Sequence, residues 1–195
     1  MNFLQIFHDV IEVKISGLAG QGCVTLASLI AKAAFLDGKY AQAFPFFGAE
    51  RRGMPVEAYC RIDEEEILLR MPIENPDYVL VLDEDLVDEK LIGPLDKRCL
   101  IIVNGRKAPE NLGLSGFRSI VVDLYSIAQE VFRAPIVNTA MLGAFAAASN
   151  AIKFQSACSV LREAFPGELA EKNELACMRA YELVRKNLLI GKYFL

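Results

Sequence analysis

The chain has 195 residues, of which 53% are hydrophobic and 24% are charged, and its formal net charge is -4. So apolar a composition excludes intrinsic disorder, because disordered chains lack the apolar side chains that would offset the entropy of ordering. The acidic balance and the scattered basic residues exclude general nucleic-acid binding, which needs Lys and Arg clustered against phosphates. The length predicts one domain over residues 1–195 with a sizeable core.

The five cysteines are widely spaced, and none of them forms a C-x-x-C pair. Structural zinc and iron–sulfur clusters normally use closely spaced cysteine pairs, so we expect no metal site in this chain. Reduced thiols fit a cytoplasmic protein. The longest fully apolar stretch, residues 140–148, is far shorter than the ~20 residues that cross a bilayer. Asp9 and Glu12 follow an N-terminus without basic residues, so we expect neither a membrane segment nor a signal peptide.

The first predicted unit is a strand, a glycine-rich loop and a helix. Val13 to Gly17 is a short apolar run that ends in glycine, as a buried strand does. Cys23 to Asp37 has its few polar residues on one narrow stripe, which predicts a helix buried on most sides. Gly38 is a suitable residue to end that helix.

The middle of the chain is predicted to be extended and looped. Lys39 to Phe47 is expected to be extended, and Phe44 to Pro55 is dense in Gly, Pro, Phe and charge, which predicts a loop. Val56 to Ile62 and Glu66 to Met71 are predicted to form a strand pair around an acidic turn, Asp63 to Glu66.

Short apolar runs rich in Val, Ile and Leu predict further interior strands at Tyr78 to Leu82, Cys99 to Val103 and Ser119 to Val122. The last third is predicted to be helical, with helices from Asp123 or Ser126 to Phe132, Asn138 to Asn150, Gln155 to Phe165 and Glu168 to Asn187. Alternating strands and helices predict an α/β fold, a three-layer α/β/α sandwich. The central strand pair indicates a mixed, largely parallel sheet.

The glycine loop is the first candidate for function. Its candidate residues for binding an anion are Gly17, Gly20, Gln21 and Gly22. Glycines let the backbone turn sharply beside a ligand, and the following helix N-terminus attracts phosphate or carboxylate. The spacing G-x-x-G-x-G matches neither the dinucleotide nor the Walker pattern, which disfavours a nicotinamide or flavin site. The loop alone leaves open an anion site or a plain structural turn.

An aromatic and charged stretch, residues 44–55, is the second candidate. Its notable side chains are Phe44, Phe46, Phe47, Glu50, Arg51 and Arg52. If it is a surface loop without function, its internal ion pair would contribute only ~0–1 kcal/mol to stability. Aromatic and Arg side chains anchor interfaces, and Arg binds carboxylate or phosphate through two hydrogen bonds. We therefore favour an interaction loop.

The small-residue stretch from Asn138 to Ala144 is the third candidate. Small residues allow another backbone to approach closely, so we favour a buried central helix, with Asn138 and Met141 as candidate contacts to a partner. His8 is the single histidine and lies near the terminus, so a histidine-based triad or metal site is not expected. No Ser lies in a G-x-S-x-G elbow, and we predict no catalytic residue in this chain.

Three blocks of the sequence resemble the gamma subunit of 2-oxoacid:ferredoxin oxidoreductases, most of all the pyruvate type. They are Gly17 to Gly22 before a helix, the block from Ala43 to Gly53 with its continuation to Asp63, and Asn138 to Gly143. The middle block is the specific one, and the resemblance covers nearly the whole chain. One departure is Ala19, where the family usually has Gly.

The resemblance implies a subunit of a larger enzyme. Such an enzyme converts a 2-oxoacid and coenzyme A into an acyl-CoA and CO2 while it reduces ferredoxin, using thiamine diphosphate, Mg and iron–sulfur clusters. The resemblance places those cofactors in alpha, beta and delta subunits, so the gamma chain would be structural and would face coenzyme A. Because coenzyme A carries phosphates, the glycine loop with Arg51 and Arg52 is where we expect it.

Two other interpretations stay open at this point. The chain could be a stand-alone module that binds a nucleotide or coenzyme A, or a purely architectural subunit that uses Phe44 to Phe47 as a docking surface. Substrate choice would belong to other subunits, with pyruvate the first expectation and 2-oxoglutarate or a branched-chain acid behind it. An exposed docking surface could also produce a homodimer of the isolated chain.

Overall fold

The computed structural model describes residues 10–46, 55–69, 71–191 and 193. These residues form a mixed six-stranded sheet with the strand order β2-β3-β1-β4-β5-β6. The strands are β1 (Ile11–Leu18), β2 (Tyr40–Phe46), β3 (Pro55–Asp63), β4 (Tyr78–Val81), β5 (Leu100–Asn104) and β6 (Arg118–Val122). Strands β1, β4, β5 and β6 are parallel, and β3 runs antiparallel to both of its neighbours. The predicted mixed, largely parallel sheet is therefore confirmed.

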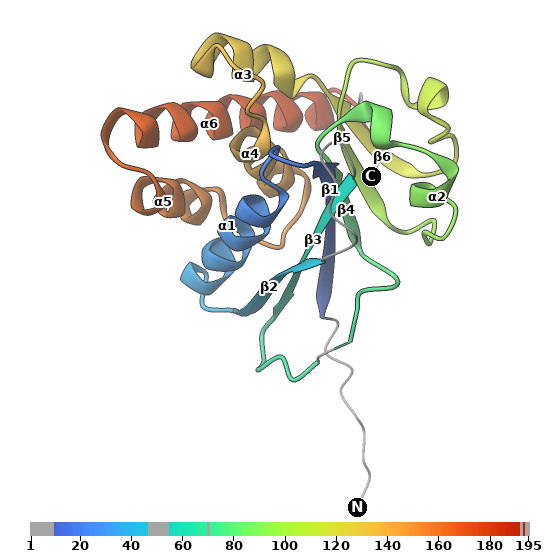
Figure 1. Ribbon diagram of the computed structural model, residues 1–195, viewed down its shortest axis with the longest axis horizontal. Coiled ribbons are helices and arrows are strands. Elements are labelled where there is room, and N and C mark those ends of the chain that lie inside the picture. Colours follow the sequence, from blue (N-terminus) through green and yellow to red (C-terminus); the bar gives the residue numbers. More distant parts are fainter. Residues whose placement is uncertain (1–9, 47–54, 70, 192, 194–195) are drawn as a thin grey trace, which may run out of the picture.

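Helices cover both faces of the sheet, as the sequence predicts (Figure 1). The longer ones are α1 (Cys23–Leu36), α3 (Leu124–Phe132), α4 (Asn138–Ala148), α5 (Phe154–Ala164) and α6 (Gly167–Leu189). The opposite face carries the short helix α2 (Glu89–Ile92) and two 3-10 turns, η1 (Glu84–Leu86) and η2 (Pro109–Leu112). One helical layer is therefore thick and the other is thin.

The larger core lies between the sheet and the long helices. Alternate residues of the strands, such as Val13, Ile15, Leu80 and Ile102, point into it and are fully buried. On the other face, the intervening residues of β4 and β5 pack under α2 and η2 in a smaller core. Burial on both faces explains why these parallel strands are continuous apolar runs in the sequence.

Helix α4 is the buried central helix that its small residues predict. Gly143 packs directly on the backbone of α6, because a Cβ at Gly143 would overlap the carbonyl oxygen of Cys177. The two helices can approach this closely only because position 143 has no side chain. Met141, a predicted partner contact, is fully buried in the core, so this prediction is wrong: the side chain packs within the chain and offers nothing to a partner.

Two predicted elements differ from the structure. Phe44 to Phe46 fell in both the extended prediction and the loop prediction, and they belong to strand β2, in which Pro45 is accommodated because β2 is an edge strand. The predicted strand Glu66 to Met71 is wrong, because residues 66–69 form no strand and β3 is already paired with β1 and β2. Of the apolar run that suggested a strand, only Ile67 is buried, while Leu68 is exposed.

The segment after β3 crosses the half of the sheet that the short helices do not cover. Gln42 donates a 2.8 Å hydrogen bond to the carbonyl of Ile67, and Arg61 donates one of 2.6 Å to the carbonyl of Met71. Arg61 is 2% exposed and also donates to Glu12 over 2.8 Å. A buried guanidinium with a carboxylate and a carbonyl partner therefore ties this segment to β1 and β3.

None of the helices that the structure describes is both long and apolar enough to cross a membrane.

Candidate functional site

The candidate site lies at the carboxyl ends of the parallel strands, between β1 and β4. The helix after β1 packs on the larger core, whereas the short helices after β4 cover the opposite face. The chain therefore leaves these two neighbouring strands in opposite directions. In open α/β sheets, ligands bind in the crevice at such a point.

The glycine loop follows β1 directly and leads into α1. Gly20 and Gly22 have φ angles of 93° and 85°, which favour glycine. The N–H of Gln21 donates to the carbonyl of Leu18 over 3.0 Å and closes a tight turn. Gly22 is the N-cap of α1, so the free N–H groups of the first helical turn lie next to the loop.

A network of side-chain hydrogen bonds among Gln21, Asp83 and Tyr125 holds the glycine loop in place. Gln21 accepts the Leu18 N–H at its Oε1 over 2.7 Å, and its Nε2 donates to Asp83 Oδ2 over 3.2 Å. The Tyr125 hydroxyl donates to the same Asp83 oxygen over 2.9 Å and lies 3.4 Å from Gln21 Nε2. Asp83 follows β4 and Tyr125 lies in the first turn of α3, so the network joins the ends of three strands.

Asn104, at the end of β5, completes the ties between strands at this edge. Its Nδ2 donates to the carbonyl of Leu82 over 2.9 Å, and its Oδ1 accepts the N–H of Leu124 over 3.0 Å. Asn104 is fully buried. It therefore couples the end of β4 to the start of α3, the helix that carries Tyr125.

A cavity of about 570 Å3 opens beside the loop. Loop residues Gly20, Gln21 and Gly22 line it together with Asn138 at the start of α4. Asn138 is 8% exposed, and a Cβ at Gly22 would lie 2.5 Å from its Nδ2. The structure thus brings the first and third sequence candidates together. The N-cap of α4 is Val137, so Asn138 lies one position inside the helix, where its Oδ1 accepts the N–H of Thr139 over 3.0 Å.

The walls of this cavity are apolar and its remaining polar groups are uncharged. Phe132, Pro135, Ile136, Phe165 and Leu169 provide the apolar walls, and Thr25, Tyr125 and Asn173 add hydroxyl and amide groups. Among the described residues that line the cavity, none is Lys or Arg. The cavity can therefore enclose an apolar or amide-bearing group, but any positive charge for a phosphate must come from elsewhere.

The second sequence candidate begins and ends at the same edge of the sheet. Phe47, Glu50, Arg51 and Arg52 lie outside the described residues. The residues that flank them are described: Pro55 pairs with Leu18, directly before the glycine loop, and Phe46 pairs with Glu57. Of the two described residues that flank Arg51 and Arg52 in the sequence, Pro55 therefore lies beside the start of the glycine loop, and Phe46 lies on β2, the second strand from β1.

Aromatic side chains gather on the face of β2 and β3 that points away from the larger core. Tyr59 lies between Phe44 and Phe46, with ring centroids 5.6 Å and 5.9 Å apart. Its hydroxyl donates to Glu57, which also pairs with Lys14 over 2.7 Å. Phe46 is 50% exposed, so part of this aromatic cluster is available to a partner.

Cys23 also lies at the loop, at the start of α1. A cysteine at a helix N-terminus is often a reactive thiolate, but burial raises the pKa of Cys23 to about 11. The thiol is 3% exposed and packs against Gly17. It therefore acts as a small apolar group that supports the loop.

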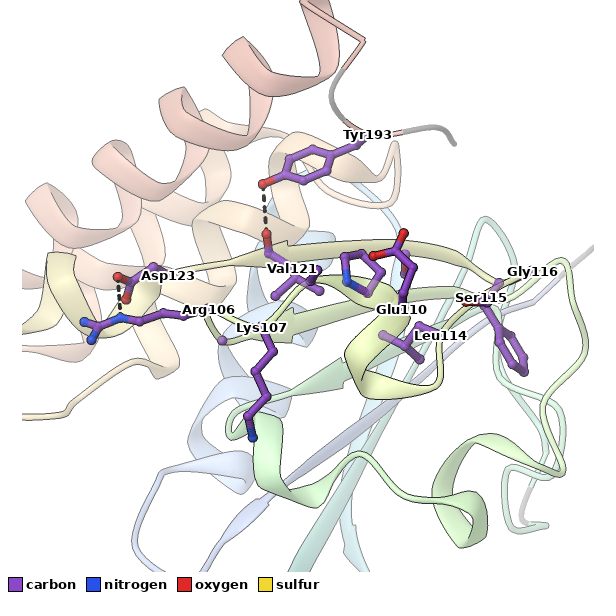
Figure 2. Close-up of a pocket in the computed structure, with 14 residues that line it drawn as sticks. Arg106, Lys107, Glu110, Leu114, Ser115, Gly116, Val121, Asp123 and Tyr193 are labelled. Atoms are coloured by element: carbon purple, nitrogen blue, oxygen red, sulfur yellow. Dashed lines mark hydrogen bonds and ion pairs between the residues drawn. The ribbon is translucent and has the colours of Figure 1, made fainter.

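A second cavity, of about 630 Å3, lies beside the edge strand β6 (Figure 2). Its two cations already have partners within the chain. Arg106 pairs with Asp123 over 2.7 Å, and Lys107 pairs with Asp85 over 2.7 Å. Across the same cavity the Tyr193 hydroxyl donates to the carbonyl of Val121 over 3.0 Å. This arrangement favours a structural role over an anion site.

Sequence reasoning missed Asp83, Asn104 and Tyr125. A signal was present for the first two, because each is a polar residue directly after an apolar strand, where parallel strands present side chains at one edge. Tyr125 had no comparable signal, since its role depends on how α3 packs against the loop.

A mixed α/β sheet with a glycine loop and a cavity at its switch point belongs to the ligand-binding class of α/β folds. Comparisons with known proteins make this more specific. The model of the pyruvate ferredoxin/flavodoxin oxidoreductase family matches residues 12–183. The chain belongs to this family, and within it the chain corresponds to the gamma subunits.

Two relatives illustrate the match. Pyruvate synthase subunit PorC of Methanothermobacter thermautotrophicus is 45% identical over 178 residues, which cover 91% of this chain and 97% of the relative. The common gamma subunit of the pyruvate/ketoisovalerate oxidoreductases of Pyrococcus furiosus is also 45% identical over 178 residues, covering 89% and 96% of the two chains.

Solved structures agree with the fold. Pyruvate oxidoreductase subunit PORC of Thermotoga maritima superposes with a TM-score of 0.79 at 34% identity, covering 89% of this chain and 96% of that one. The 2-oxoglutarate:ferredoxin oxidoreductase of Magnetococcus marinus gives a TM-score of 0.77 at 18% identity, covering 91% of this chain and 31% of that one. The second likeness concerns the fold alone.

Proposed function

We propose that this chain is the coenzyme-A-facing gamma subunit of a pyruvate:ferredoxin oxidoreductase. In this role it assembles as one domain, residues 1–195, with alpha, beta and delta subunits in the cytoplasm, and the complex reduces ferredoxin. The partner subunits hold thiamine diphosphate, Mg and the iron–sulfur clusters. Pyruvate is the proposed substrate, with 2-oxoglutarate or a branched-chain 2-oxoacid as alternatives.

The observation that carries the proposal is the convergence of three sequence blocks at one edge of the sheet. Gly20 to Gly22 and Asn138 share the cavity, and Pro55, which follows the arginine-bearing segment, pairs with Leu18. Helix N–H groups and arginines are suited to phosphates, and the uncharged cavity is suited to an apolar or amide-bearing part of the same molecule. Coenzyme A combines all of these groups.

The direct test replaces both arginines in the assembled enzyme. Arg51→Ala/Arg52→Ala is expected to raise the apparent KM for coenzyme A at least tenfold, because two cations that neutralise phosphates are removed. The KM for the 2-oxoacid should stay within twofold. The matched control is Arg185→Ala, which removes an arginine that contacts Tyr181 on α6. An unchanged KM for coenzyme A would exclude contact between these arginines and the cofactor.

The assembly itself is tested by isolating the tagged chain from its host. Mass spectrometry of the co-purifying chains should identify thiamine-binding and iron–sulfur subunits. The complex should oxidise a 2-oxoacid with coenzyme A and a viologen acceptor, and the chain alone should be inactive. A tagged chain that purifies alone and binds a nucleotide or coenzyme A would support the stand-alone module. Recovery of the partners with no effect of the arginine variants would support a purely architectural subunit.

A further inference from the structure

The conformation of the glycine loop depends on which way the Gln21 amide points. Its Oε1 accepts the Leu18 N–H over 2.7 Å, and this bond holds the start of the loop. The backbone bond from Gln21 N to the Leu18 carbonyl closes the same turn. If the amide were reversed, its NH2 group would face the Leu18 N–H, and two donors would oppose each other.

Asp83 determines that orientation. An ionised carboxylate only accepts hydrogen bonds, so the group of Gln21 that faces it must be the NH2, and the observed Nε2–Oδ2 distance is 3.2 Å. The oxygen of the amide is then left for the Leu18 N–H. The other oxygen of Asp83 accepts the N–H of Asp85 over 3.1 Å, which fixes the carboxylate at the end of β4.

Tyr125 reinforces the same arrangement from α3. Its hydroxyl donates to Asp83 Oδ2 over 2.9 Å and lies 3.4 Å from Gln21 Nε2. Burial and the Asp83 carboxylate raise the pKa of Tyr125 to about 12, so the hydroxyl keeps its proton at neutral pH. The ring lines the cavity beside Gly20 and Gly22, so its position also shapes the wall that a ligand meets.

We propose that Asp83 and Tyr125 are positioning residues that hold the glycine loop, through Gln21, in the shape that receives coenzyme A. The inference rests on the proposed function, because the loop must face coenzyme A for its shape to affect the reaction. Neither residue reacts. Their contribution is that the loop is already arranged when the cofactor arrives, so less ordering accompanies binding.

The test exchanges hydrogen-bond donor and acceptor between residues 83 and 21 in the assembled enzyme. Asp83→Asn keeps the shape of the side chain but leaves one acceptor oxygen where two are used, so when that oxygen keeps the Asp85 N–H, an NH2 group faces Gln21 Nε2. We expect a five- to tenfold rise in the KM for coenzyme A, with less than a twofold change in kcat and in the KM for the 2-oxoacid. Adding Gln21→Glu restores an acceptor opposite the new donor and keeps an oxygen for the Leu18 N–H. The double variant should return to within threefold of the original KM.

Two further variants complete the design. Tyr125→Phe removes the hydroxyl donor and should raise the same KM two- to fivefold, which keeps the test available if Asp83→Asn fails to assemble. Asp88→Asn is the matched control, because Asp88 accepts the Leu91 N–H at the start of α2, away from the glycine loop. It should leave the KM for coenzyme A within twofold.

The outcomes separate the two proposals. If the arginine variants raise the KM for coenzyme A but Asp83→Asn and Tyr125→Phe do not, the positioning role is wrong and the coenzyme-A-facing role stands. If the double variant is as impaired as Asp83→Asn, the polarity of the Gln21 amide is not what matters, and the positioning role is again wrong. If no variant of either set changes this KM, both proposals are overturned.

Discussion

Single residues decide how closely the elements of this chain can pack, and Gly143 is the clearest example. The structure leaves no room for a side chain there, because the carbonyl of Cys177 occupies the place of a Cβ. The sequence indicated close packing from small residues, but it did not show which backbone would approach. That information comes only from the packing of α4 on α6.

Gly143→Ala is therefore expected to destabilise the isolated chain by about 3 kcal/mol, because helix α6 must move away. Urea unfolding followed by circular dichroism measures the change. Gly38→Ala is the control, since Gly38 has a φ angle of 86° but no atom lies within 4 Å of a Cβ there. Backbone strain alone should cost about 1 kcal/mol. Equal losses in the two variants would contradict the steric explanation.

One ion pair links α5 to α6 and gives a pH-dependent prediction. Arg162 donates from two nitrogens to the Glu174 carboxylate, and these hydrogen bonds lower the Glu174 pKa. A lowered pKa in the folded chain means stability that is present above the usual glutamate range and is lost as the pH falls through the folded value.

Glu174→Gln should accordingly reduce the unfolding free energy at pH 7 by about 0.5 kcal/mol, a small amount because the Arg162 side chain is 62% exposed. The difference should begin to shrink as the pH falls through the usual glutamate range and should disappear below the lowered pKa of Glu174. Thermal unfolding of both proteins between pH 3 and 7 measures this difference in stability at neutral and at low pH. A difference that persists unchanged at pH 3 would show that the charge is not its source.

At the scale of elements, the parallel strands and long helices could be predicted because burial on both faces produces uninterrupted apolar runs. The predicted run from Tyr78 to Leu82 contains β4, and the helix predicted from Cys23 nearly coincides with α1. The failure at Glu66 to Met71 has a physical reason. An apolar run predicts a strand only if an edge is free to pair with it, and both edges of β3 are already used.

The segment after β3 is instead held by Arg61, and its energetics can be tested. Arg61→Met should destabilise the chain by about 2–3 kcal/mol, because Glu12 loses its cation and the Met71 carbonyl loses its donor. The double variant Glu12→Gln/Arg61→Met should cost at least about 1 kcal/mol less than the sum of the single changes. Urea unfolding of the original chain, the two single variants and the double variant completes this double-mutant cycle. Unfolding free energies that add strictly would rule out coupling between Glu12 and Arg61.

At the scale of the whole molecule, the sequence indicated the candidate site only in separate pieces. The glycine loop and Asn138 were each identified, but Pro55 and Asn138 come to the loop only through the antiparallel pairing of β3 with β1 and the packing of α4. The position of Asp83 after a strand was visible in the sequence, but the contacts of Asp83 and Tyr125 with Gln21 span 62 and 104 residues of the chain and follow only from the fold.

The aromatic cluster of Phe44, Phe46 and Tyr59 is the surface on which we expect assembly to depend. Phe46→Ser should lower the recovery of partner subunits with the tagged chain severalfold, because the side chain is half exposed and aromatic anchors dominate interfaces. The stability of the free chain should change by less than about 1 kcal/mol. Leu189→Ser, at an 81% exposed residue of α6, is the control. Undiminished recovery would assign the interface to another surface.

The two edges of the sheet determine how this subunit can join others. Pro45 removes one backbone donor from edge strand β2, and Tyr193 already occupies the Val121 carbonyl on edge strand β6. Each edge strand therefore has one backbone group that is not available to a foreign strand, which interrupts a regular ladder there. We therefore expect partner subunits to recognise this chain mainly by its side chains. The interrupted edges should also disfavour the stacking of unassembled subunits into fibrils through their edge strands.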